Sequence, residues 1–490
     1  MNTEVADERP NVLLLLSDQH SKFHIGAYGD QLVRTPHLDG LAARGIKMNS
    51  AYCASPVCCP SRMSFMSSRT PSRNRVWDNS DLLPSSIPTW AHAMGLAGYE
   101  TSLIGRMHFN GHDQRHGFEN RPLGEYGATH PGAPRKGAPL FRKITAATTG
   151  QNRTAVEKAG RGYASYHVFD EKVAETTSSY LREHAAAPES RPFAAVAGFL
   201  LPHCPYVAHG DLFDYYYDRV DIPGHPETEP DAIRKFKKIR GLYPPIADER
   251  IRVARAAYFG MCEFLDRQIG RILSTLTETG LDRNTLIVYS SDHGEMAGEK
   301  GCWWKSNYFE GSVGVPMIFS LPGVIPEGLQ SDQICNLMDL GPTLIDMAGS
   351  DPLPDTDGHS LWPILQGRTD DSLPDETFSE HYGQEKIPSR MIRTGRWKCY
   401  VYHDETPPVL YNLVNDPEEN NDLACDPAFE DVRDRLVERL YQDWDPERVN
   451  RECAIQHRDM KVITAWGREI KPEHPDTVPV PVGGENLELR

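Results

Sequence analysis

The sequence predicts an α/β fold: a largely parallel central sheet with helices on both faces, followed by a small C-terminal antiparallel sheet with a helix. Two observations support this prediction. Short apolar runs alternate with stretches of helical periodicity over most of the 490 residues, which is typical of strand–helix–strand units. Beyond about residue 370, alternating runs follow one another closely, which favours antiparallel pairing. We therefore expect a main domain over residues 1–370 and a C-terminal subdomain with an extended tail over residues 371–490.

Five apolar runs of four to eight residues are long enough for buried strands and too short for buried helices. They are Val12–Leu16, Thr101–Ile104, Phe193–Leu200, Thr285–Tyr289 and Pro316–Ser320. Helical spacing is found in three intervening stretches, and in two of them a proline stands near the expected first turn. These stretches are Pro36–Arg44, Ile87–Leu96 and Asp248–Thr277.

The C-terminal part has its own pattern. Strands are expected at Met391–Thr394, Trp397–Tyr402 and Val409–Leu413, followed by a helix at Phe429–Trp444. The tail from residue 471 has too little apolar content for a core, so we expect it to lie along a surface or a neighbouring molecule. The Gly-, Ala- and Thr-rich stretch from 127 to 161 is predicted to be a loop that covers a pocket.

Composition excludes several classes of function. The chain has 52 Lys and Arg against 69 Asp and Glu, a formal net charge of −17, so nucleic acid is not an expected partner. An anionic ligand would need a locally positive pocket. The N-terminal apolar run is too short to cross a membrane, and the ten scattered cysteines suggest reduced thiols. We expect a cytoplasmic protein that does not contact membranes.

Polar side chains follow two of the expected strands. Asp18 and Gln19 end the first, and Asp292 and His293 end another. Ligands of open α/β sheets bind at the carboxyl ends of strands. Mostly oxygen donors favour Ca²⁺ or Mg²⁺, and the imidazole also allows Mn²⁺. The alternative is that each aspartate caps a turn or helix.

The run Cys58-Cys59-Pro60-Ser61-Arg62 resembles the core motif of the type I sulfatases. In that family the cysteine is oxidised to formylglycine, whose hydrated form carries two hydroxyls: one attacks sulfur and the other later expels sulfate. Cys58 is in register with the proline and arginine, and Cys59 is not. The alternative for Cys58 is a buried thiol beside a turn.

Two longer passages resemble the choline-sulfatase branch of this family, which belongs to the alkaline-phosphatase superfamily. They begin SRNRVWDNSDLLPSS and DHGEMAGEKGCWWKSNYFEG, and the likeness extends from Asn11 to about Asp422. The resemblance implies an alkaline-phosphatase-like fold, hydrolysis of an aryl, alkyl or sugar sulfate monoester, one divalent metal ion with Ca²⁺ favoured, and a formylglycine-generating enzyme as maturation partner. We also expect a homo-oligomer, either a dimer or a tetramer.

The resemblance also implies roles for individual residues. The metal ligands would be Asp18, Gln19, Asp292, His293 and the hydrated formylglycine made from Cys58. Arg62 would hydrogen-bond the formylglycine, and Asn79 would face the ester oxygens. Arg106 and His108 match a Lys-x-His pair, where the arginine is a departure that keeps the charge. His203 and Lys305 match groups at the bridging oxygen. Taken singly, these residues are more often loop, salt-bridge or solvated groups.

One departure bears on the substrate. Choline sulfatases enclose a quaternary ammonium with aromatic groups, yet Glu125–Arg135 reads EYGATHPGAPR, without the expected tryptophan. Nearby His112, Arg115, His116 and His130 would suit a neutral or anionic leaving group, or would simply be solvated. Three alternatives stay open: a phosphonate monoester or phosphodiester hydrolase with the same nucleophile, choline sulfatase proper, and a binding protein without catalysis.

Overall fold

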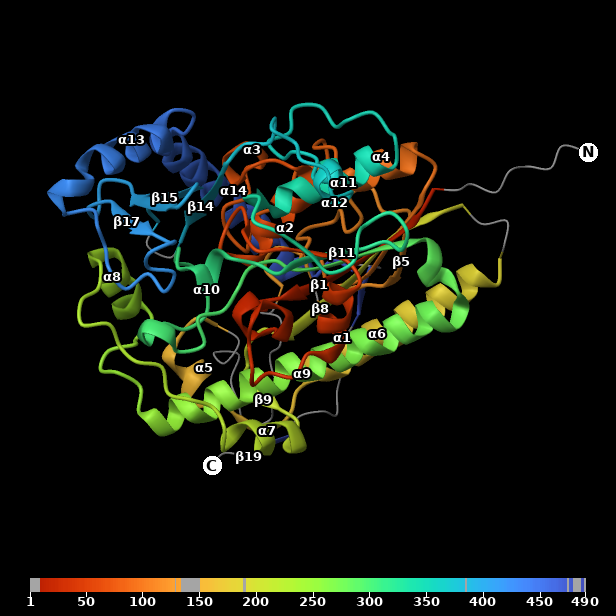
Figure 1. The fold of residues 1–490 in the computed structure, drawn as a ribbon, viewed down its shortest axis with the longest axis horizontal. Coiled ribbons are helices and arrows are strands. Elements are labelled where there is room, and N and C mark those ends of the chain that lie inside the picture. The colour runs from red at the N-terminus through yellow and green to blue at the C-terminus, as the bar shows by residue number, and fades with distance from the viewer. Residues whose placement is uncertain are drawn as a thin grey trace, which may run out of the picture.

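The computed structural model describes residues 9–127, 129–133, 150–187, 191–383, 386–473, 476–478 and 486–488. An eight-stranded sheet forms its centre, in the order β12-β2-β11-β10-β1-β8-β4-β5 (Figure 1). Its strands are β1 (Asn11–Asp18), β2 (Ile46–Met48), β4 (Glu100–Gly105), β5 (Asn120–Leu123), β8 (Phe193–Pro202), β10 (Thr285–Ser291), β11 (Met317–Ser320) and β12 (Leu329–Ser331). Only β11 runs against its neighbours among these eight, so the predicted largely parallel sheet is confirmed.

The central strand β1 explains why the sheet forms here. Every residue of its sequence NVLLLLSD is buried, because β8 and β10 flank it and helices cover both faces. Its register with β10 pairs Ser17 with Ser291. The next residues along the two strands, Asp18 and Asp292, are therefore brought side by side at the carboxyl edge of the sheet.

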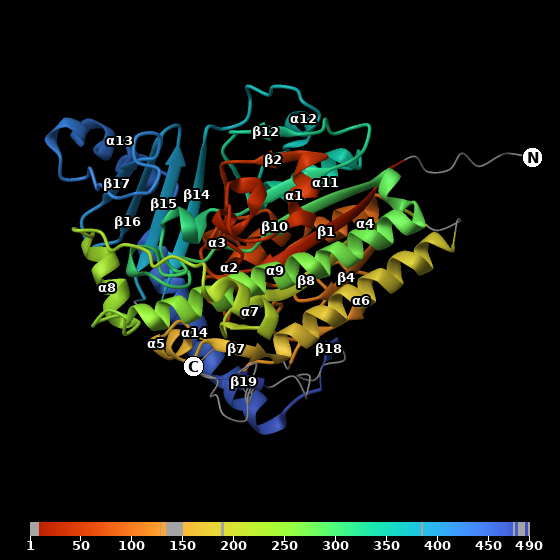
Figure 2. The same cartoon turned by 60° about the horizontal axis from the view of Figure 1, so that its bottom comes forward.

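Helices cover the two faces of the sheet (Figures 1 and 2). One face carries α6 (Ser165–Ala185), α7 (Gly210–Tyr217) and α9 (Asp248–Thr279), and the other carries α2 (Cys58–Ser67), α4 (Trp90–Leu96) and α11 (Leu340–Met347). Helix α1 (Pro36–Ala43) and α9 match the prediction closely. Helix α4 begins three residues later than predicted, because Thr89 and His92 form a capping box there.

The C-terminal part is an antiparallel sheet, as predicted, but it has four strands where three were predicted. It contains β14 (Glu376–Tyr382), β15 (Pro388–Thr394), β16 (Trp397–Tyr402) and β17 (Val409–Asn412), with α13 (Glu430–Tyr441) packed against a core of their own. Sequence reasoning missed β14, which lies in a stretch rich in Pro and Asp, and α14 (Pro446–Ile470). Other buried residues of this sheet join the main core, so the division at residue 370 stays a prediction.

Short elements complete the chain. The predicted loop from 127 to 161 is wrong in part, because it contains α5 (Arg153–Glu157) and the start of β7 (Gly160–Tyr163); residues 128 and 134–149 lie outside the described ones. The tail supplies β18 (Thr477–Val478), which pairs with β6 (Glu125–Tyr126), and β19 (Asn486–Glu488), which pairs with β7. The rest are β3 (Ala51–Tyr52), α3 (Pro71–Asn74), β9 (Val207–Ala208), α8 (Asp231–Ile239), α10 (Glu310–Val313), β13 (Cys335–Asn336) and α12 (Trp362–Leu365). Within the described ranges, no helix has the length and apolar character needed to cross a membrane.

Candidate functional site

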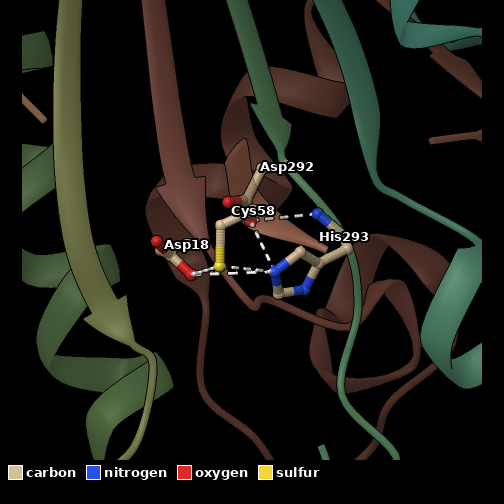
Figure 3. Close-up of side chains that lie close together, drawn as sticks. All are labelled: Asp18, Cys58, Asp292 and His293. Carbon is tan, nitrogen blue, oxygen red and sulfur yellow. Dashed lines mark hydrogen bonds and ion pairs between the residues drawn. The ribbon is translucent and has the colours of Figure 1, made fainter. Parts of the chain in front are cut away.

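Four potential ligands converge at the carboxyl edge of the sheet (Figure 3). Asp18 ends β1, Asp292 and His293 follow β10, and Cys58 is the first residue of α2. One donor atom from each lies within 4.8 Å of all the others, and all four side chains are buried. Cys58 Sγ is 3.2 Å from His293 Nε2 and 3.7 Å from Asp18 Oδ1. The sheet register and the start of one helix thus create the cluster.

The donor set fits one divalent cation. Burial lowers the pKa of His293, so its ring is neutral at neutral pH. His293 Nδ1 lies 3.0 Å from the carbonyl oxygen of Gly294, which can only accept, so Nδ1 carries the proton and Nε2 offers a lone pair to the cluster. Two carboxylates and one neutral imidazole suit Ca²⁺, Mg²⁺ or Mn²⁺.

Arg62 lies between the two carboxylates. Its Nε donates to Asp292 Oδ2 at 2.8 Å, and its Nη2 lies 3.3 Å from Asp18 Oδ2. Arg106 Nε also donates to Asp18 Oδ2, at 2.6 Å. Burial alone would raise the pKa of Asp18, but Arg106, His203, Arg62 and Lys305 together hold it well below its usual range. Asp18 is therefore ionised.

Gln19 and Lys305 are joined to each other beside the cluster. Lys305 Nζ donates to Gln19 Oε1, and Gln19 Nε2 donates to the buried carboxylate of Glu295. Burial would lower the pKa of Lys305, but Cys58, Asp18, Cys204 and Asp292 raise it above its ordinary value, so the ammonium stays charged. Arg62, Arg106 and Lys305 are three cations facing the two carboxylates of the cluster. These cations offset the buried carboxylates of the cluster, and Arg106 is also paired with Glu125.

The remaining predicted residues lie around this centre. His108 Nδ1 is 2.9 Å from Arg106 Nη2. Asn79 is exposed, and its Oδ1 accepts the backbone N–H of Cys59 at 2.9 Å, which caps the first turn of α2. His203 is close enough to lower the pKa of Asp18, but its ring nitrogen contacts the carbonyl of Cys204 at 2.6 Å. Within the described residues, no hydrogen bond joins His203 or Asn79 directly to the four ligands.

Two acidic residues at the site escaped sequence reasoning. Glu125 binds Arg106, and Glu295 binds Gln19 and accepts the hydroxyl of Tyr206 at 2.8 Å. Glu295 stands three residues after Asp292, so its position near a ligand was a usable signal. Glu125 stands 17 residues after His108, and no local pattern marked it.

Two of the four basic residues suggested for a leaving group are paired with acidic residues. Arg115 makes a double ion pair with Asp476, at 2.9 and 3.1 Å, and His116 lies 3.3 Å from the carboxylate of Asp113. His112 is exposed and His130 is buried. The sequence showed the basic residues, but it did not show that acidic residues pair with two of them.

Comparisons with known proteins agree on one family. The family model for sulfatases matches residues 10–350, and that for the C-terminal region of N-sulphoglucosamine sulphohydrolase matches residues 298–445. A choline-sulfatase of Rhizobium meliloti (strain 1021) is 36% identical over 458 residues, covering 87% of this chain and 86% of its own. Arylsulfatase K of Homo sapiens is 28% identical over 503 aligned positions, covering 96% and 89%.

Solved structures show the same fold. Phosphonate monoester hydrolase of Agrobacterium radiobacter has a TM-score of 0.72 at 24% identity, covering 89% of this chain and 95% of its own. A structure in complex with its substrate D-glucosamine-2-N,6-O-disulfate also gives 0.72, at 19% identity, covering 89% and 99%. At these identities the likeness concerns the fold alone.

The metal site can be tested through its charged ligands. Replacing Asp292 by Asn removes one of the two carboxylates. The amount of bound metal and the rate of sulfate-ester hydrolysis should therefore fall together, each by at least about tenfold. Metal content is measured by atomic emission on protein dialysed against a fixed metal concentration. The matched control is Asp404→Asn, in the exposed group of His403, Asp404 and Glu447. Unchanged metal content in Asp292→Asn would contradict the site.

Proposed function

The chain belongs to the sulfatase family, and we propose that it cleaves a sulfate monoester with formylglycine made from Cys58 and one divalent metal ion. As a family member it is a sulfuric ester hydrolase. The observation that supports the proposed chemistry is the convergence of Cys58, two carboxylates and a neutral imidazole among three buried cations. These groups suit an anionic ester in a water-poor site.

The metal would be held by Asp18, Gln19, Asp292, His293 and the modified residue 58. We propose Ca²⁺, with Mn²⁺ and Mg²⁺ as alternatives, because oxygen donors predominate. When bound, the ion withdraws electron density from sulfuryl oxygens and lowers the pKa of a hydroxyl beside it. Arg62 supports this site by holding both carboxylates from the side.

The remaining groups are proposed to act on the ester itself. Arg106 would stabilise charge on the sulfuryl oxygens, and His108, hydrogen-bonded to it, would take a proton when sulfate leaves. Lys305 and His203 would neutralise or protonate the bridging oxygen, and the charged state of Lys305 supports that role. Asn79 caps α2 beside the nucleophile, and its exposure supports a place at the entrance to the site.

Maturation, cellular location and assembly belong to the same proposal. A formylglycine-generating enzyme is the proposed maturation partner, and a small-molecule or saccharide sulfate ester is the proposed substrate. Ten unpaired cysteines support a cytoplasmic location.

A homo-oligomer is proposed on the evidence of helix α14. Apolar side chains form an exposed stripe along this helix from Ile455 to its end: Ile455, Val462, Ile463, Trp466 and Ile470, between 42% and 72% exposed. The segment 446–470 has five basic and four acidic side chains, so it is nearly neutral in a chain of charge −17. We therefore propose that a second copy covers this stripe.

The assignment of the nucleophile predicts different outcomes for two adjacent cysteines. Cys58→Ala should abolish turnover of a nitrophenyl sulfate, whereas Cys59→Ala should leave most of it, because only residue 58 is in the cluster. In protein made with an active maturation enzyme, Cys58 should be converted to an aldehyde. The tryptic peptide that contains residue 58 should therefore have a lower mass than its sequence predicts. The reverse pattern would move the nucleophile to Cys59.

The proposed substrate class also leads to a prediction about rates. An activated aryl sulfate should react at least about fivefold faster than choline sulfate, because a lost cation–π contact costs roughly 1 kcal/mol or more. kcat/KM is compared for nitrophenyl sulfate, choline sulfate and a nitrophenyl phosphonate ester. Faster cleavage of choline sulfate would indicate choline sulfatase proper, and faster cleavage of the phosphonate would indicate the phosphorus alternative.

The proposed interface on α14 predicts that charged substitutions there will change the oligomeric state. Val462→Glu with Trp466→Glu should convert a dimer or tetramer into a smaller species, because charge on the stripe disfavours burial. Light scattering after gel filtration measures the mass, and the control is Leu96→Glu, which changes an apolar residue that is 90% exposed on α4. An unchanged mass would exclude α14 as the interface.

A further inference from the structure

Glu125 makes three contacts with the segment that carries Arg106 and His108. One carboxylate oxygen accepts the backbone N–H groups of Met107, at 3.1 Å, and His108, at 2.7 Å. The other oxygen lies 3.4 Å from Nη1 of Arg106. Glu125 is fully buried, so these contacts are formed without competition from water.

The backbone of His108 needs such support. Its φ angle is 63°, in the left-handed region that residues with a side chain rarely adopt. This conformation turns the ring back towards Arg106, whose Nη2 lies 2.9 Å from His108 Nδ1. Conformations of this kind persist only where the surroundings determine them, and the Glu125 carboxylate is the group that binds the N–H of His108.

The C-terminal tail in turn holds Glu125. The backbone carbonyl of Asp476 accepts the N–H of Glu125 at 2.9 Å, and β18 pairs with β6 in parallel register, Thr477 beside Glu125. The carboxylate of Asp476 binds Arg115 at 2.9 and 3.1 Å, which anchors the tail at this place. A continuous path of contacts therefore leads from the tail through Glu125 to the two residues at the site.

We propose that Glu125 is a positioning residue for Arg106 and His108, and that the tail segment 476–478 keeps Glu125 in place. The proposal rests on the function proposed above for Arg106 and His108. Position 106 has arginine where the family resemblance leads one to expect lysine. An arginine can bind two carboxylates at once, so a second anionic partner helps to fix its orientation. Its fork binds Asp18 through Nε and Glu125 through Nη1.

Two kinds of change test the path. Glu125→Gln and Glu125→Ala act on the carboxylate directly. Gly124→Ala acts on the tail, because a Cβ there would come within 2.3 Å of the carbonyl oxygen of Asp476. The matched control is Gly95→Ala on α4, where an added Cβ would meet nothing within 4 Å. Removal of residues 474–490 serves as a second way to release the tail.

The measurements are kcat and KM for nitrophenyl sulfate on fully matured, metal-loaded protein, with the thermal unfolding midpoint recorded for each variant. Displacement of catalytic groups by about 1 Å can cost about 100-fold in rate. Both Glu125 variants should therefore lose about 10- to 100-fold in kcat with KM changed less than about threefold. Gly124→Ala and the truncation should lose about tenfold in kcat, and Gly95→Ala should keep the parent rate.

Combined variants decide whether the tail acts through Glu125. In the Glu125→Ala background, Gly124→Ala should cost less than about twofold further, because the path is already broken. If the two losses multiply, the proposal that the tail acts through Glu125 is overturned; if Glu125→Gln keeps the parent kcat, the positioning role of Glu125 is overturned. Arg106→Ala and His108→Ala, measured alongside, separate the two proposals: full rates in both would overturn the roles proposed for them, whereas low rates with an active Glu125→Gln would overturn only the present inference.

Discussion

The site depends on two carboxylates that the sheet forces together in its interior. Parallel pairing of β1 with β10 leaves Asp18 and Asp292 at neighbouring strand ends, where neither has access to water. Two like charges in such a place would oppose folding unless cations offset them. Arg62 binds both and Arg106 binds one, so the protein supplies its own counter-charges before any metal arrives.

A second buried group of charges links the two sheets. Lys398 of β16 lies 3.0 Å from Glu310, which also binds Lys22 at 3.1 Å. Lys22 stands three residues after Gln19, so the C-terminal sheet is tied to the loop that leaves the site. Removing one partner from a buried pair of this kind typically costs about 3–5 kcal/mol. The antiparallel sheet therefore contributes to the shape of the site as well as to stability.

The parts that the sequence predicted are those that a local pattern encodes. Strands β1, β8 and β10 are buried throughout and mostly apolar because both faces of the sheet are covered, and α9 carries a continuous apolar stripe. Helices α6 and α14 were missed because charged and hydroxyl side chains interrupt their periodicity. Family likeness supplied the site residues in chain order. The contacts of these residues depend on tertiary structure. Glu125 could not be predicted from sequence, because its partner His108 lies 17 residues away and no local pattern links the two.

For Arg62, the family resemblance predicted the residue but not its hydrogen-bond partners. The motif marked it as a site residue, and the structure does bring it to the cluster. Its hydrogen bonds, however, go to Asp18, Asp292 and two backbone carbonyls, those of Ser17 and Arg106. A motif therefore identified the residue, while its partners depended on how the strand ends and α2 meet.

The burial of residue 58 has a consequence for the order of events in the life of the protein. Cys58 is 1% exposed at the start of a helix whose ten residues are all buried, so an enzyme cannot reach it once the chain has folded. In the maturation proposed above, oxidation of Cys58 would therefore have to come first, and folding would then enclose the aldehyde. An aldehyde beside a lysine would normally condense with the amine, but Lys305 is kept protonated by its anionic neighbours and is not nucleophilic. The charges proposed to bind a sulfate ester would thus also protect the proposed aldehyde from condensation with Lys305.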